Sequence, residues 1–139
     1  MRKTSFMVST WAFAVFAAIL FTPGPSLLAE NEADPLNGKT FVGEIGEKGK
    51  TTSQYKEEMS FKDGVMVSSA CSSLGFESFS YTATNSDDGV HFVAEATNPT
   101  EGTLTWEGVV NGDALDATSV WEKPGNPPDE SWLKATLKD

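Results

Sequence analysis

Short alternating stretches separated by turn residues are the feature of this chain that most limits its fold. From residue 37 onward apolar and polar residues alternate, and Gly, Asn, Asp or Pro recurs about every 11 to 13 residues. The segments Lys62-Asp63-Gly64 and Asn111-Gly112-Asp113 are strong hairpin signals, because Asp, Asn and Gly tolerate the positive φ angles of tight turns. Helical spacing of apolar residues is almost absent there. The pattern predicts an all-β domain.

The alternation predicts eight short strands joined in sequence by short links. Such links force antiparallel neighbours, since a parallel crossover needs a dozen or more residues. A sheet of eight sequential strands can remove its exposed edges by closing on itself. We therefore expect residues 37–139 to form one eight-stranded antiparallel up-and-down β-barrel, with a two-sheet sandwich as the alternative. The expected strands are 39–45, 53–61, 65–69, 76–83, 90–97, 103–110, 114–122 and 132–137.

The first 29 residues have the pattern of a secretory signal peptide. A basic start precedes an apolar run from Trp11 to Phe21, a Pro-Gly-Pro turn ends it, and Ala29 supplies a small residue at the expected cleavage site. The run is short for a spanning helix, which needs roughly 20 apolar residues. We therefore expect a secreted or periplasmic protein without a stable membrane anchor after cleavage, an uncleaved anchor being the alternative. Residues 30–36 are polar and are expected to form a flexible N-terminal segment.

The charge of the chain limits its partners. The formal net charge is −10, and removing Arg2 and Lys3 with the signal peptide leaves −12 and no Arg. Arg provides the bidentate fork that reads phosphates and guanine edges. An acidic surface also repels nucleic acid and anionic lipid. We expect no nucleic-acid binding, and partners limited to a small apolar ligand or another protein.

The residues that usually carry chemistry are few. Cys71 and His91 are the only members of their types, so no internal disulfide can form and no zinc site can be completed from Cys and His. Cys71 is therefore either buried or paired with another chain. A Cys71–His91 nucleophile–base pair is conceivable but lacks a local signature. Glu57 is in phase with inward residues and is the first carboxylate to inspect, and residues 85–89 fit a turn better than a calcium loop. We expect no enzyme activity, cofactor or metal.

Both ends of the expected domain resemble the avidin family of small secreted barrels. The opening Leu36-Asn-Gly-Lys-Thr-Phe41 is similar to that family's first strand, and Trp121, the loop 123–131 and Trp132-Leu-Lys-Ala-Thr-Leu137 are similar to its end. The resemblance implies a calycin-type (lipocalin/avidin-like) barrel. The polar Asn, Ser and Tyr residues that hold biotin in that family have no counterpart here, so biotin binding is not implied.

The mature chain as a whole also resembles small secreted bacterial proteins of unknown function. The similar segments are Gly38-Lys-Thr-Phe41, Phe61-Lys-Asp-Gly64, Ala70-Cys71, Gly75-Phe76 and Trp106-x-Gly-x-Val-x-Gly-Asp113.

Aromatic residues are the most useful functional signal. The ones expected on inner strand faces are Phe41, Phe61, Phe79, Tyr81, Phe92, Trp106 and Trp121. In an eight-stranded barrel such rings either fill the interior or line a cavity for one small ligand. We expect non-catalytic binding of a small, partly apolar ligand in the barrel mouth, with Tyr81, Trp106, Trp121 and Trp132 as contacts. The alternatives are a filled barrel acting as a protein-interaction, inhibitor or assembly module, and a minor hydrolase.

Overall fold

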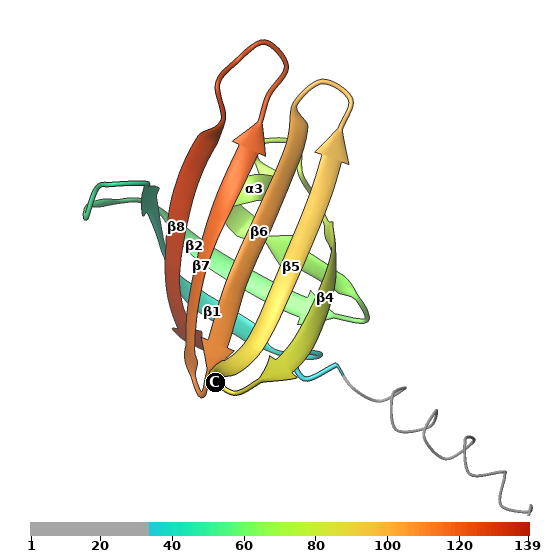
Figure 1. Cartoon of the computed structure of the whole chain (residues 1–139), viewed down its shortest axis with the longest axis vertical. Coiled ribbons are helices and arrows are strands. Elements are labelled where there is room, and N and C mark those ends of the chain that lie inside the picture. Colours follow the sequence, from blue (N-terminus) through green and yellow to red (C-terminus); the bar gives the residue numbers. More distant parts are fainter. Residues whose placement is uncertain (1–33) are drawn as a thin grey trace, which may run out of the picture. The chain divides into compact units, whose positions relative to one another are not determined.

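A computed structural model describes residues 34–139, which form a closed barrel of eight antiparallel strands (Figure 1). Each strand pairs with the next one in sequence, and β1 pairs with β8 to close the ring. The expected all-β, eight-stranded antiparallel barrel is thereby confirmed. The elements are β1 (Thr40–Glu47), β2 (Ser53–Lys62), β3 (Val65–Ser68), α3 (Ser69–Ser72), β4 (Phe79–Ser86), β5 (Gly89–Asn98), β6 (Gly102–Asn111), β7 (Ala114–Glu122) and β8 (Asp129–Leu137). The expected signal peptide, residues 1–29, lies outside the described residues.

Alternate residues of every strand point into the barrel and fill most of it. The Phe61 ring is the centre of this core, with edge-on contacts to Phe41, Tyr81 and Phe92 at centroid distances of 6.0, 5.0 and 5.1 Å. Edge-to-face packing is a favoured arrangement of aromatic rings. The part of the barrel around Phe61 is therefore solid, and any space for a ligand lies elsewhere.

One end of the barrel is closed by the segment that precedes β1. Leu36 is 0% exposed and belongs to the core, although the sequence analysis assigned residues 30–36 to a flexible segment. Tyr81 Oη donates a hydrogen bond to Asp34 Oδ2 at 2.5 Å and fixes the start of the described chain. The expectation was wrong for residues 34–36, because a single apolar side chain in a polar stretch is enough to anchor it. Residues 30–33 lie outside the described residues.

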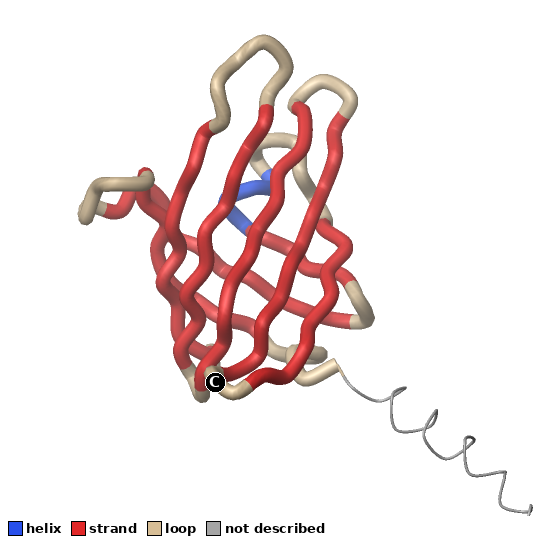
Figure 2. The backbone as a smooth tube through the Cα atoms, in the orientation of Figure 1, coloured by secondary structure: helices blue, strands red, loops and turns tan. Residues whose placement is uncertain are grey.

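The other end of the barrel, which we call the mouth, holds the loops that follow β1, β3, β5 and β7 (Figures 1 and 2). β3 and β4 share only two residue pairs, Val65 with Ser80 and Met66 with Phe79. Beyond them residues 69–78 cover the wall as α3, the short blue helix in Figure 2, and a loop. Phe76 in this loop is buried and packs edge-on against Trp121 at 5.7 Å. The expected fourth strand therefore begins at Phe79 rather than at residue 76.

β1 and β8 approach each other closely at Gly43. A β-carbon at this position would lie 2.0 Å from the carbonyl oxygen of Lys134 and 2.5 Å from Cα of Ala135. Glycine is the residue that allows this close approach, since it carries no side chain. The closure of the ring depends on that absence.

Candidate functional site

A cavity of about 80 Å³ opens at the mouth of the barrel. The buried part of its lining is mostly apolar and includes Ile45, Leu104 and Trp106. The exposed part of its lining includes Tyr55 and Leu74, which are 59% and 40% exposed. Exposed apolar residues around an enclosed apolar space are typical of binding sites. We call this space the mouth cavity.

Trp106 provides an unsatisfied donor beside the mouth cavity. Its side chain is 1% exposed, and its Nε1 has no hydrogen-bond partner among the described residues. Trp121, which also lines the cavity, is satisfied: its Nε1 donates to the carbonyl oxygen of Glu101 at 2.7 Å. Most buried polar groups in proteins have a partner, so an unpaired indole N–H calls for an explanation.

Cys71 lies in α3, where its thiol is buried and lines the mouth cavity. Burial raises the pKa of the Cys71 thiol, the nearby polar groups of Ser68 and Trp106 oppose the rise, and the nearby charge of Glu57 adds to it. The thiolate is the nucleophilic form of cysteine. A thiol with a raised pKa therefore carries little nucleophile at neutral pH.

The buried carboxylate of Glu57 accepts hydrogen bonds from the first residues of α3. It points inward from β2, as its phase in the sequence indicated, and is only 3% exposed. Its Oε1 accepts hydrogen bonds from Ser69 Oγ at 3.1 Å and from the backbone N–H of Ala70 at 3.0 Å, while Oε2 has no partner. Burial raises the pKa of the Glu57 carboxyl, and the nearby hydroxyl of Ser68, followed by the hydrogen bonds from Ala70 and Ser69, opposes the rise. Glu57 therefore fixes the helix that carries Cys71.

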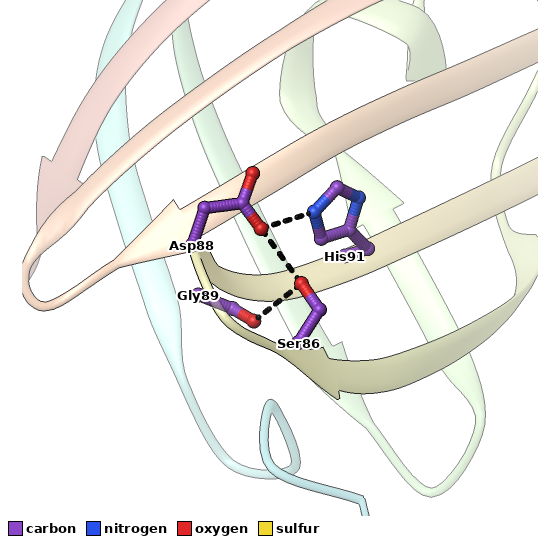
Figure 3. Close-up of polar contacts among 4 residues, drawn as sticks. All are labelled: Ser86, Asp88, Gly89 and His91. Carbon is purple, nitrogen blue, oxygen red and sulfur yellow. Dashed lines mark hydrogen bonds and ion pairs between the residues drawn. The ribbon is translucent and has the colours of Figure 1, made fainter.

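His91 lies on the outer face of β5, with its side chain exposed (Figure 3). Cys71, in contrast, is buried and lines the mouth cavity, which His91 does not. The Nε2 of His91 contacts Asp88 Oδ1 at 2.7 Å, and Ser86 Oγ donates to the same oxygen at 2.7 Å. The hydrogen bond from Ser86, followed by the one with His91, lowers the pKa of Asp88. In a catalytic triad the histidine stands between the serine and the acid. Here the acid stands between the other two, so this group is a stabilised turn without an activated hydroxyl.

Two of the four residues expected to contact a ligand line the mouth cavity. They are Trp106 and Trp121. Tyr81 is buried at the opposite end beside Asp34, and burial followed by this neighbour raises the pKa of its phenol. Trp132 points outward from β8, and its ring packs against Gly46, in the space that a β-carbon at that position would occupy. Its Nε1–H donates a hydrogen bond to the carbonyl oxygen of Lys50 at 2.7 Å. Neither Tyr81 nor Trp132 lines the mouth cavity.

Sequence reasoning missed the other lining residues, among them Tyr55, Cys71 and Leu74. The alternation of β2 contains the signal for Tyr55, which is in phase with the inward Glu57 and Met59. Residues 69–78 have no strand periodicity, so nothing in the sequence placed Cys71 or Leu74 at the mouth.

Other sites find less support. A wider depression of about 440 Å³ crosses the outer face of β5 to β8 between His91 and Trp132, but it is shallow and open to solvent. Within residues 34–139 no three His, Cys, Asp or Glu side chains are grouped so as to hold a metal ion. None of the helices in this part of the chain has the length and apolar character to cross a membrane.

Comparisons with protein-family models, with curated proteins and with solved structures find no match for the chain.

Proposed function

We propose that this chain is a non-catalytic binding protein that acts outside the cytoplasm and holds a small, partly apolar ligand in the mouth cavity. The observation that carries the proposal is the indole N–H of Trp106, which is buried without a partner beside that cavity. Leaving such a donor unsatisfied costs about 1–3 kcal/mol. A ligand that brings a hydrogen-bond acceptor to this donor would recover that free energy on binding.

The surroundings of Trp106 support the same function. Ile45 and Leu104 offer apolar surface, and Trp121 offers an aromatic face. Burial of apolar area would supply affinity, at about 25 cal/mol per Å² removed from water. The export of the protein is inferred from residues 1–29 alone.

A protein-interaction module is the second candidate. Phe61 and its neighbours fill the rest of the interior, which leaves little room for a bulky ligand. Tyr55 and Leu74 at the mouth are exposed apolar residues of the kind that contact partner proteins. In that case the mouth cavity would receive one apolar side chain of the partner.

The test is a small-molecule screen against the mature chain, read by two-dimensional NMR and by thermal unfolding. Binders should shift the amide signals of residues at the mouth and raise the melting temperature. Ser119 is buried on β7 and lines the cavity, so Ser119→Val should fill part of the space and weaken binding. Thr118→Val is the matched control, because Thr118 is the exposed neighbour on the same strand.

Leu74→Ala gives a second variant that leaves the core intact, and it should also weaken binding. Three outcomes would refute the proposal: a broad screen that finds no ligand, ligands whose shifts map away from the mouth, or equal binding by Ser119→Val, Leu74→Ala and Thr118→Val. A stable complex with a periplasmic protein, lost in Leu74→Ala, would favour the second candidate.

A further inference from the structure

We infer that the mouth cavity takes the tip of an elongated amphiphile whose outer end is positively charged, an alkylammonium-type ligand. This inference rests on the proposed function and specifies the class of ligand. It follows from the size of the cavity, from the character of its inner lining and from the charges at its rim.

The size of the cavity limits what can enter it. At about 80 Å³ it is about half the size of the engineered 150 Å³ cavity that encloses benzene. It therefore has room for roughly three or four non-hydrogen atoms. A ligand large enough to bind well must leave the rest of its length outside, over Tyr55 and Leu74, which lie exposed around the opening.

The inner lining favours an uncharged tip. Ile45, Leu104 and Trp106 are buried and apolar, and burying an unpaired charge among them would be costly. An anionic tip is further disfavoured because the carboxyl of Glu57 lies close enough to Cys71 for its charge to raise the pKa of that thiol. An aliphatic chain end with an ether oxygen is uncharged and mostly apolar, and its oxygen can accept a hydrogen bond from Trp106 Nε1.

The charges around the opening favour a positive outer end. Asp129 is exposed and lines the cavity, whereas none of the residues lining it is a lysine. The two lysines of the neighbouring β1–β2 loop are already paired, Lys48 with Glu130 and Lys50 with Glu47, both at 2.9 Å. An ammonium group at the rim would therefore meet an unpaired carboxylate.

An exposed aromatic ring at the rim also favours a positively charged outer end. Lys123 Nζ lies 4.3 Å from the centre of the Trp121 ring, so a cation already occupies this aromatic face and an ammonium end would use the other ring at the rim. Tyr55 offers a second, largely exposed ring beside the opening. Ammonium groups bind aromatic faces through the ring quadrupole. Lys123 is also the group that an anionic ligand would use, and the experiment below separates the two cases.

The experiment compares three ligands that share a six-carbon chain with a methoxy oxygen at its inner end. They differ only at the outer end, which is an ammonium, a hydroxyl or a carboxylate, and they are named below by their parent compounds hexylammonium, hexanol and hexanoate. Binding to the mature chain is followed by NMR and, at alkaline pH where more thiolate forms, by protection of Cys71 from a small thiol reagent, since this thiol lines the cavity. Hexylammonium should bind about two- to fivefold more tightly than hexanol, the range expected for an exposed ion pair, and hexanoate should bind most weakly. All three should slow the modification of Cys71.

Two substitutions test the role of the rim charge. Asp129→Asn should remove most of the advantage of hexylammonium over hexanol and leave the affinity for hexanol unchanged. Asp113→Asn is the matched control, since Asp113 lies in the exposed turn between β6 and β7, away from the cavity lining. It should leave the advantage intact.

The outcomes distinguish this inference from the function on which it rests. Binding of hexanoate at least as tight as that of hexylammonium, or an equal effect of the two substitutions, would overturn the inference and leave the binding function standing. If none of the three ligands binds or protects Cys71, the proposed function fails together with the inference.

Discussion

Replacing Leu36 with alanine tests whether the segment before β1 is part of the barrel core. The Leu36 side chain is 0% exposed and belongs to the same hydrophobic cluster as the aromatic residues of the strands. Its backbone is held as well, since the N–H of Leu36 donates to Asp34 Oδ1 at 3.1 Å. Because both the side chain and the backbone of Leu36 are held in place, the surrounding structure has little freedom to collapse around a smaller residue.

The expected loss follows from burial and from this limited freedom. Substitutions of fully buried leucine by alanine cost about 2.7–5.0 kcal/mol, and the cost increases with the cavity that remains. We expect Leu36→Ala to lower the free energy of unfolding by about 3–4 kcal/mol. For a domain of about 100 residues each kcal/mol lowers the melting temperature by about 4–8 °C, so the midpoint should fall by at least about 12 °C.

Urea and thermal unfolding of the mature chain, followed by circular dichroism, would measure this loss. Leu74→Ala is the matched control, because Leu74 is 40% exposed and should cost below about 1 kcal/mol. A loss for Leu36→Ala that is no larger than the loss for Leu74→Ala would refute the reasoning and would return residues 34–36 to the status of a loose tail.

Two further predictions concern stability. Burial raises the pKa of Glu57, so ionisation of its carboxyl lowers the stability of the fold as the pH rises above the ordinary glutamate pKa of about 4.3. Glu57→Gln cannot ionise, so its free energy of unfolding in urea, relative to that of the original chain, should increase between pH 4 and pH 7. A difference that does not change with pH would contradict this. Gly43→Ala would place a β-carbon 2.0 Å from the Lys134 carbonyl oxygen, and we expect it to cost at least about 3 kcal/mol, whereas Ala135→Gly, which removes one methyl group next to it, should cost less.

The sequence predicted the barrel well because the evidence for strands is local. Alternation along β5, β6 and β7 placed those strands within a residue or so of where they lie, and the Asp63-Gly64 turn is a tight hairpin with Asp63 at a φ of 51°. The short links then dictated antiparallel pairing and closure. These features can be recognised in the sequence without knowing which residues pack against one another.

The parts that failed depend on contacts between distant segments. Leu36 is apolar in a polar stretch, and only the open end of the barrel gives it a place to pack. Trp132 was expected to contact the ligand at the mouth, but in the sheet formed with β1 and β7 it is Leu133 that is buried, and Trp132 points outward. The mouth cavity depends on the sizes of side chains from six or more segments, which no local pattern encodes.

The pairing of β1 with β8 joins the two ends of the described sequence. Seven residue pairs connect these strands, and Lys138 adds a backbone hydrogen bond to Thr40 at 2.8 Å. Until β8 has been synthesised, β1 therefore lacks one of its two neighbours, and every shorter nascent chain exposes unpaired strand edges. Folding of this barrel is thus tied to completion of the polypeptide, and a chain that stops before its last strand cannot close the ring.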